Sequence, residues 1–285
     1  MRMQVLAARA PIWAAAVEHA SQLINGPDFQ SHKRTTRTVA GFALIDGTRV
    51  FVKRVDEGSW LKGWILRLRG SRARRVLRGA AMLKAAGFAR PEPLGVAEGR
   101  AFGAIRASYV ISEALDDARI MSQVVLAGGR RFFLRRCQTL GAVAREIRRL
   151  HDAGIYTHDL QETNLMLAGG DGGDWKIRFV DLEDFRRARI VSERRRMLNL
   201  VHLDRTIGRF LPRTQRLRFL YTYLGGHPDS ALVRHSLNCF FALRDRAQRR
   251  ARPHQRVNVD VASGNNGAVI ASESLPQVGG SSRLT

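Results

Sequence analysis

The chain has 285 residues, 45% of them hydrophobic and 26% charged, which is enough for one large or two modest domains with a substantial core. Lysine and arginine total 48 against 25 acidic residues, and the net charge of +23 favours anionic partners such as nucleic acid, an anionic membrane surface or a phosphate-rich substrate. Cys137 and Cys239 are the only cysteines and form no CxxC pattern, which excludes a disulfide framework or a zinc site and favours a reducing cytosol.

The first residues carry an apolar patch at 10–17, followed directly by Glu18 and His19. The patch is too short for a membrane span and lacks the hydrophobic centre of a signal peptide, so we expect neither. Residues 1–32 are assigned to an N-terminal extension.

Strand-like sequence follows. Residues 35–45 are rich in β-branched side chains, Asp46 and Gly47 form a strong hairpin signal, and V-F-V-K at 50–53 resumes the strand. The strand ends in Lys53. A lysine in this place is most often a solvated edge charge, so its meaning depends on residues further along the chain.

A helix is predicted over 72–86 and is closed by Gly87 as a C-cap. No acidic residue lies between Glu57 and Glu92, so the polar side of this helix is entirely basic. Its apolar face is formed by Val76, Leu77, Ala80 and Leu83.

The segment 60–78 interleaves tryptophan and leucine with many arginines. Such a mixture suits a membrane interface, and a core-packing helix with a solvated basic side explains it equally well. Both interpretations stay open. Charge alone would allow nucleic-acid binding, but no recognised motif is present and no specific nucleic-acid partner is expected.

The middle of the chain combines a strand and a helix. Residues 109–115 indicate a buried strand that leads into a polar crossing, and residues 132–151 indicate an amphipathic helix. The apolar stripe of this helix is predicted to lie in the core and consists of Leu140, Val143, Ile147 and Leu150.

The most informative stretch is H-D-L-Q-E-T-N at 158–164. Asp159 and Asn164 are five positions apart, and Asp181 comes seventeen positions later at the end of an apolar run. This is the order and spacing of the catalytic loop and the metal-binding aspartate in kinases that use ATP. Turn capping would explain Asp159 or Asn164 alone, but not all three residues with these apolar flanks.

The chemistry explains why these residue types are needed. Phosphoryl transfer requires a carboxylate that faces the attacking hydroxyl and accepts its proton, and we assign this role to Asp159. Magnesium prefers hard oxygen ligands, which Asn164 and Asp181 would supply. Lys53 then becomes the candidate for contacting the nucleotide phosphates, because V-F-V-K has the character of the V-A-I-K strand of kinases.

The sequence departs from the protein-kinase pattern in three places. T-T-R-T at 35–38 stands where a glycine-rich loop is expected, and the helix at 72–86 has no glutamate to pair with Lys53. D-L-E-D at 181–184 replaces D-F-G, so Glu183 and Asp184 are either additional metal ligands or, more simply, solvated loop acids.

The C-terminal part begins with a very basic run at 186–196. Helical patterns follow at 197–203, 216–223 and 232–250. From residue 253 onward, Gly, Ser and Asn dominate without periodicity, and we expect a disordered tail over 253–285.

Taken together, these residues resemble the lipopolysaccharide kinase family, which includes the Kdo and heptose kinases of the Gram-negative inner core. The resemblance rests on V-F-V-K-R at 50–54, R-G-S-R-A-R-R-V-L-R-G at 69–79, A-A-G-F-A-R-P-E-P-L at 85–94 and the two catalytic stretches. R-L-R-F-L-Y-T-Y-L-G at 216–225 extends it.

The resemblance implies an α+β, bilobal protein-kinase-like fold with an N-lobe over 33–115 and a C-lobe over 116–252. It further implies ATP and Mg²⁺, with Lys53 on the nucleotide, Asp159 as base, and Asn164 and Asp181 on the metal. The acceptor would be a sugar hydroxyl of an anionic glycolipid or lipopolysaccharide precursor, met by a cytoplasmic enzyme peripheral to the inner membrane.

Two other function classes stay open. The catalytic loop does not encode the acceptor, so a protein kinase or a small-molecule kinase of the aminoglycoside type would carry the same motif. A pseudokinase that binds an anionic surface without turnover is the second alternative. The oligomeric state has no signal in the sequence.

Overall fold

The computed structural model describes residues 1–59, 63–66, 70–127, 133–169, 175–225 and 230–263, with side chains through residue 249. The chain divides into two contact units, Met1–Leu243 and Arg244–Thr285. The first unit holds every residue of the predicted site.

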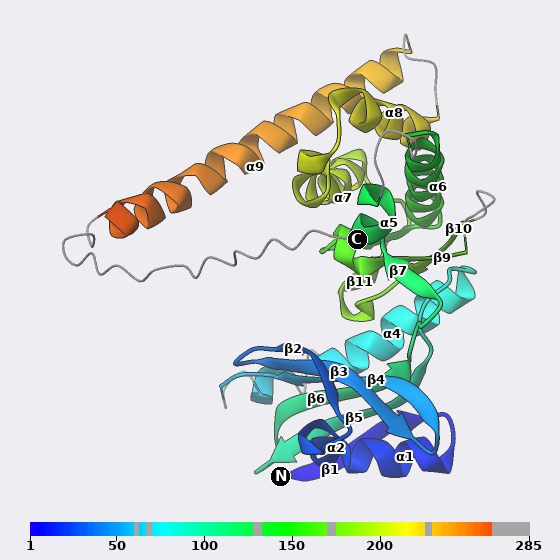
Figure 1. Ribbon diagram of the computed structural model, residues 1–285, viewed down its shortest axis with the longest axis vertical. Helices are drawn as coiled ribbons and strands as arrows, with labels where there is room; N and C mark the ends of the chain where they lie inside the picture. Colours follow the sequence, from blue (N-terminus) through cyan, green and yellow to red (C-terminus); the bar gives the residue numbers. More distant parts are fainter. Residues whose placement is uncertain (60–62, 67–69, 128–132, 170–174, 226–229, 264–285) are drawn as a thin grey trace, which may run out of the picture. The chain divides into compact units, whose positions relative to one another are not determined.

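A six-stranded antiparallel sheet forms the N-terminal part of the first unit (Figure 1), in the spatial order β1-β5-β6-β4-β3-β2. Its strands are β1 (Arg2–Ala8), β2 (Gln30–Arg34), β3 (Thr38–Ile45), β4 (Thr48–Asp56), β5 (Pro93–Ala101) and β6 (Ala104–Glu113). Asp46 and Gly47 have φ values of 48° and 70°, so the hairpin turn predicted between β3 and β4 is confirmed.

Residues 1–32, which we expected to be an extension, are instead part of this sheet. β1 pairs with β5 and β2 pairs with β3. The apolar patch at 10–17 lies mostly in helix α1 (Pro11–Glu18), which together with α2 (Ala20–Asn25) packs its buried residues on the sheet. The patch is therefore apolar because it covers a sheet face, and the N-terminal lobe begins at β1.

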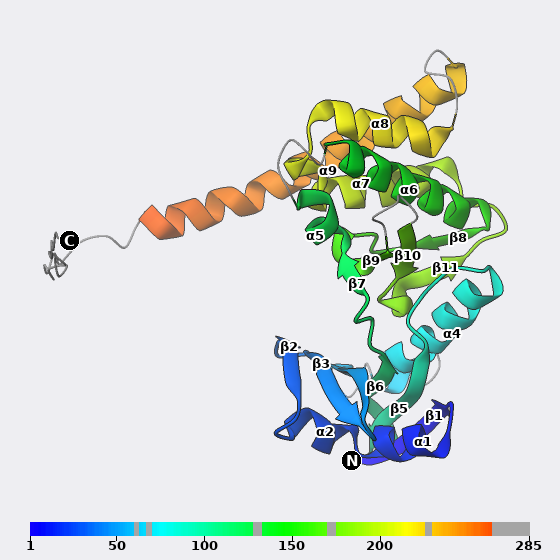
Figure 2. The same cartoon turned by 45° about the vertical axis from the view of Figure 1, so that its right-hand side comes forward.

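Lys53 lies on the opposite face of the sheet from these helices. Its neighbours Val50 and Val52 are fully buried in the cluster formed with α1 and α2. Because successive side chains of a strand alternate between the two faces, the Val50 and Val52 face cannot be the face of Lys53. Figure 2 shows α4 on that other side of the sheet.

Helix α4 (Arg72–Ala85) matches the helix predicted over 72–86. The Ser71 hydroxyl caps it by accepting a hydrogen bond from the backbone N–H of Arg74 at 3.2 Å, and Gly87 follows its end with a φ of 72°. The helix buries Ala73, Val76, Gly79, Ala80 and Leu83, whereas Leu77 is half-buried.

The C-terminal part of the first unit is mainly helical. Its short strands are β7 (Ala118–Ile120), β8 (Ile155–Thr157), β9 (Leu165–Gly169), β10 (Trp175–Phe179) and β11 (Phe185–Arg187). They form the three-stranded sheet β10-β9-β7 and the pair β11-β8. Its helices are α5 (Met121–Leu126), α6 (Phe133–Asp152), α7 (Glu193–Thr206), α8 (Arg213–Leu224) and the first part of α9 (Ala231–Ser263).

The stripe predicted on α6 is confirmed as core, because Leu140, Val143, Ile147 and Leu150 are at most 3% exposed. Helix α9 runs to Ser263, so residues 253–263 are helical where we expected a tail to begin, and residues 264–285 lie outside the described part. Among the described helices, none combines the length and the apolar character needed to cross a bilayer.

Candidate active site

The loop with the catalytic motif starts where strand β8 ends. The side-chain amide of Asn199 on α7 binds the backbone of Thr157 twice. Its Nδ2 donates to the Thr157 carbonyl at 2.6 Å, and its Oδ1 accepts from the Thr157 N–H at 3.4 Å. The Thr157 hydroxyl in turn accepts a hydrogen bond from the backbone N–H of Asp159 at 3.2 Å, and Leu160 is buried directly after it. Asp159 is thus held from both sides by the core of the C-terminal part.

The amide of Asn199 is itself fixed by a buried histidine. Nε2 of His151 on α6 lies 3.0 Å from Asn199 Oδ1, which only accepts, so this nitrogen donates. Nδ1 then accepts from the Tyr223 hydroxyl at 2.7 Å. Burial lowers the pKa of His151 to about 4, and the nearby Arg196 adds to the effect while the hydrogen bond to Asn199 opposes it. The imidazole is therefore neutral and connects α6, α7 and α8 behind the catalytic loop.

Asp159 and Asn164 lie side by side, as the motif predicts. Asn164 Nδ2 donates to the Asp159 carbonyl at 3.0 Å and reaches its carboxylate Oδ2 at 3.4 Å. Gln161 donates to the other carboxylate oxygen, Oδ1. These two amides orient the carboxylate, and because the nitrogen of Asn164 is used in this way, its side-chain oxygen points elsewhere.

Asp181 joins the same site through the backbone. The N–H of Val180 donates to the carbonyl of Asn164 at 3.0 Å, which places the next residue, Asp181, beside the catalytic loop. Asp181 has φ 57° and ψ 59°, a left-handed conformation that is uncommon for residues other than glycine and is found at functional turns. Asp181 is followed by Leu182 and Glu183, where protein kinases have phenylalanine and glycine.

Lys53 reaches this turn from the sheet. Its Nζ lies 2.7 Å from Asp181 Oδ1 and 4.0 Å from Glu183 Oε1. The structure therefore connects all four predicted site residues, Lys53 to Asp181, Asp181 through the backbone to Asn164, and Asn164 to Asp159. Their chemical roles stay predictions.

Glu183 is the residue that sequence reasoning undervalued. We expected a solvated loop acid or an additional metal ligand, but Glu183 is only 5% exposed and accepts a hydrogen bond from Arg72 Nη1 at 3.0 Å. Burial raises its pKa, Asp181 and Asp184 act in the same direction, and Lys53 and Arg72 oppose the rise. Two features of the sequence could have pointed to a buried role for Glu183. The polar residues of the helix at 72–86 are all basic, and Glu183 is an additional acid two positions after Asp181.

Arg72 is the first residue of α4, and the backbone around it is tied to the sheet. Its N–H donates to Glu57 Oε1 at 2.9 Å, and the next N–H donates to the Ser108 hydroxyl at 3.1 Å. Ser108 also donates to Glu57, which is 9% exposed. These contacts satisfy N–H groups that the first turn of a helix leaves free, and they place an anion at the positive end of the helix.

A second buried acid, Glu98 on β5, holds the same helix end. It accepts hydrogen bonds from the Ser71 hydroxyl at 2.7 Å and from Arg74 Nε at 3.0 Å. Burial would raise the pKa of Glu98, but the hydrogen bonds from Ser71, Arg100 and Arg74 outweigh burial and hold the pKa below its usual range. Glu57 and Glu98 therefore hold the N-terminal end of α4 at the sheet.

Helix α4 also lies directly on the turn η3 (Leu182–Asp184). A Cβ atom added to Gly79 would lie 2.0 Å from the carbonyl oxygen of Leu182. Only glycine permits this approach, because any side chain would collide with backbone that cannot rotate away. Helix α4 and the turn η3 are therefore in direct backbone contact at Gly79 and Leu182.

The donor set suits magnesium. Asp181 offers a carboxylate and Asn164 an amide oxygen, the hard ligands that Mg²⁺ takes beside nucleotide phosphates. Carboxylate oxygens of Asp181, Glu183 and Asp184 also lie within 4.8 Å of one another. Glu183 already forms ion pairs with Lys53 and Arg72.

The segment expected to cover the nucleotide is a hairpin turn without glycine. Residues 35–37 connect β2 and β3, and the Thr35 hydroxyl accepts hydrogen bonds from the N–H of Thr38 at 3.0 Å and from that of Arg37 at 3.4 Å.

The polar crossing that we predicted at the end of the strand over 109–115 lies after Glu113. Strand β6 ends there, and the chain leaves the large sheet for β7.

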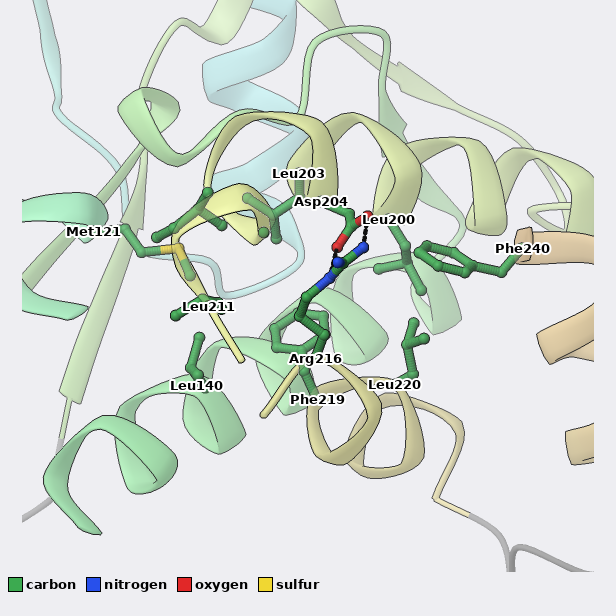
Figure 3. Close-up of a pocket in the computed structure, with 12 residues that line it drawn as sticks. Met121, Leu140, Leu200, Leu203, Asp204, Leu211, Arg216, Phe219, Leu220 and Phe240 are labelled. Carbon is green, nitrogen blue, oxygen red and sulfur yellow. Dashed lines mark hydrogen bonds and ion pairs between the residues drawn. The ribbon is translucent and has the colours of Figure 1, made fainter. Parts of the chain in front are cut away.

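A separate apolar pocket lies among the C-terminal helices (Figure 3). Arg216 and Asp204 form an ion pair in its wall, with contacts of 2.7 and 2.6 Å. The other lining residues include Met121, Leu140, Leu200, Leu203, Phe219 and Phe240. None of them belongs to the site described above, so we place the chemistry at Asp159 and not in this pocket.

Comparisons with known proteins show the family and the fold of this chain. The model of the lipopolysaccharide kinase (Kdo/WaaP) family matches residues 31–223. A solved structure described as WaaP in complex with acyl carrier protein is similar, with a TM-score of 0.63 and 19% sequence identity over 88% of this chain and 99% of that chain. No curated protein matches. The structural likeness confirms the α+β, protein-kinase-like fold expected from the sequence.

Proposed function

Because the chain belongs to the lipopolysaccharide kinase (Kdo/WaaP) family, we propose that it transfers the γ-phosphate of ATP to a hydroxyl of a Kdo or heptose sugar in the lipopolysaccharide core. Phosphotransfer to a sugar hydroxyl is the activity of the family as a whole; the particular sugar is the proposal. The observation that supports phosphotransfer is the contact series from Lys53 through Asp181 and Asn164 to Asp159, and the choice of a lipopolysaccharide sugar as acceptor rests on the family match.

Asp159 is the base in this mechanism. Its carboxylate, oriented by Gln161 and Asn164, faces the acceptor hydroxyl and takes its proton as the hydroxyl oxygen attacks the γ-phosphorus. The new O–P bond forms as the bond from the γ-phosphorus to the bridging oxygen breaks. ADP leaves, and the proton stays on Asp159 until solvent removes it.

Asp181 and Asn164 would hold magnesium, which when bound neutralises the charge on the nucleotide phosphates. Lys53 comes from the sheet to the same place and can contact the α- and β-phosphates. Lys53 comes from β4, whereas Asn164 and Asp181 come from the C-terminal part, so the site is formed by both parts of the first unit.

Aromatic and basic side chains on segments next to the catalytic loop favour an anionic acceptor. The guanidinium of Arg195 lies 4.8 Å from the centre of the Tyr156 ring, whose own centre is 5.5 Å from that of the exposed His158. Arg187 and Arg194 are exposed on neighbouring segments. Aromatic rings beside guanidinium groups suit a sugar that carries phosphate or carboxylate.

We further propose that the enzyme works in the cytoplasm on the surface of the inner membrane. Trp64 and Ile65 are 47% and 42% exposed, and the tip of the β5–β6 hairpin carries Phe102 at 87% exposed. Trp60 and the two arginines Arg67 and Arg69 of segment 60–78 lie at 60–62 and 67–69, outside the described residues. The net charge of +23 would add attraction to anionic lipid.

Because the similar structure holds an acyl carrier protein, such a protein is a second partner to include in binding assays.

The test is a panel of acceptors with the purified full chain, ATP and magnesium. We expect phosphate incorporation into lipid-linked Kdo or heptose saccharide, and its loss in Asp159→Asn. Incorporation into a free aminoglycoside or a peptide, with none into lipid-linked saccharide, would replace the proposal by the small-molecule or protein kinase. Equal ATP turnover by wild type and Asp159→Asn would remove the mechanism.

A further inference from the structure

We propose that Glu183 and Arg72 are positioning residues for Lys53, and that together they do what a glutamate on the helix does in protein kinases. In this arrangement the acid comes from the turn after Asp181 and the helix supplies an arginine that holds the acid in place. This inference rests on the proposed function, because it assigns Lys53 to the nucleotide phosphates.

The helix itself offers no acid. All ionisable residues of α4 are arginine or lysine, and the nearest acids in sequence are Glu57 and Glu92. Glu57 is already bound to the N–H of Arg72 and to the Ser108 hydroxyl, where it closes the start of the helix. A second carboxylate, other than Glu57, must therefore hold Lys53 together with Asp181, whether or not a metal ion is bound.

Glu183 meets that requirement. Its Oε1 lies 4.0 Å from Lys53 Nζ and 3.0 Å from Arg72 Nη1, so one oxygen faces both cations. Asp181 holds Lys53 through Oδ1, and a metal ion bound to Asp181 would weaken that attraction by sharing the negative charge of the carboxylate. Among the described residues, Glu183 is the second carboxylate within 4.0 Å of Lys53 Nζ, and it is buried, so its attraction for Lys53 is little screened by solvent.

Arg72 balances the second acid. Asp181 and Glu183 carry two negative charges beside a single lysine, and a buried carboxylate without its own partner is costly. Arg72 supplies that partner: its Nη1 lies 3.0 Å from Glu183 Oε1, while its Nε lies 3.6 Å from Glu57 Oε2. Arg72 can do this reliably because its backbone is bound to Glu57 and because Gly79, two turns on, seats the helix against the backbone of Leu182.

The competing role for Glu183 is that of a metal ligand, together with Asp181 and Asp184. The geometry favours positioning, because the oxygen of Glu183 nearest the site is already shared by two cations. The two roles predict different dependence on magnesium, which makes them separable by experiment.

The experiment measures ADP affinity by calorimetry for the full chain, once with EDTA and once across a magnesium titration. Variants are Glu183→Gln, Arg72→Met and the double variant. Arg216→Met is the matched control, because Arg216 also forms a half-buried ion pair, with Asp204, but far from the site in the chain. Circular dichroism confirms that each variant is folded.

We expect each single variant to weaken metal-free ADP binding about tenfold, the size of one charge-assisted hydrogen bond. The double variant should lose little more, since both residues act through Lys53. The half-saturating magnesium concentration and the control should not change. Arg72→Lys keeps the positive charge and should recover part of the lost ADP affinity. If Arg72→Met or Glu183→Gln does not fold, Arg72→Lys and Glu183→Asp are measured in their place.

Unchanged metal-free affinity with a raised magnesium requirement in Glu183→Gln would overturn the inference and make Glu183 a metal ligand. Unchanged affinity under both conditions would overturn it as well. If the wild type binds no nucleotide at all, the proposed function fails first, so that failure is distinguished from the failure of this inference.

Discussion

The close approach of α4 to the turn after Asp181 makes Gly79→Ala the sharpest test of how the site is built. The added Cβ would lie 2.0 Å from the carbonyl oxygen of Leu182 and 3.0 Å from its carbonyl carbon. Both atoms are backbone, so no side-chain rotation relieves the overlap. Either the helix moves away from the turn, or the turn that carries Asp181 moves away from the helix.

The magnitude follows from two opposing terms. Replacing glycine by alanine inside a helix stabilises it by about 1 kcal/mol. Forcing an extra carbon into a closely packed contact costs about 1–3 kcal/mol. Because the overlap is with fixed backbone, we expect the upper part of that range and a net loss of about 1–2 kcal/mol in the free energy of unfolding.

Gly141→Ala on α6 is the matched control. The Cβ there would meet only the end of the Arg145 side chain at 3.4 Å, so the helix-propensity gain should appear almost undiminished. Urea denaturation would then separate the two variants by about 2–3 kcal/mol. Gly79→Ala should also weaken ADP binding, whereas Gly141→Ala should not. Equal stabilisation of both variants, with equal ADP affinity, would refute the packing of α4 against the turn.

Two further predictions concern the catalytic loop and its support. Asp159→Asn should lower kcat by about 10²–10⁴-fold and leave the KM for ATP nearly unchanged, because the base acts on the acceptor; a proportional rise in KM would contradict this. For His151, the folded-state pKa of about 4 lies below the usual value of 6.5, so the unfolded chain binds more protons between these pH values. The free energy of unfolding should therefore fall by up to about 3 kcal/mol as pH drops from 6.5 to 4, which urea titrations at several pH values would measure. In His151→Gln this part of the pH dependence should disappear; an unchanged profile would show that other groups cause it.

The sequence was sufficient for the features that depend on local pattern. The Asp46-Gly47 turn, the helix closed by Gly87 and the buried stripe of α6 all follow from spacing and residue type over short stretches. Lys53, Asp159, Asn164 and Asp181 could be selected together because the kinase motif fixes their order along the chain. The structure then adds that they are in contact.

Other features depend on pairing between distant segments, which a single sequence does not reveal. β1 carries no strong strand signal, and its place in the sheet depends on β5, some ninety residues later. The same holds for Glu183, whose burial depends on Arg72, a residue 111 positions earlier. A charged residue in a loop is usually solvated, so only the three-dimensional arrangement shows that this one is enclosed.

Mass spectrometry of envelope glycolipid would show whether the protein phosphorylates a core sugar in the cell, by comparing cells that carry the wild-type chain, the Asp159→Asn variant or no copy of the protein. We expect one added phosphate on a core Kdo or heptose with the wild type and none in the other two samples. A phosphate that persists with Asp159→Asn, or glycolipid that is identical in all three samples, would contradict this expectation.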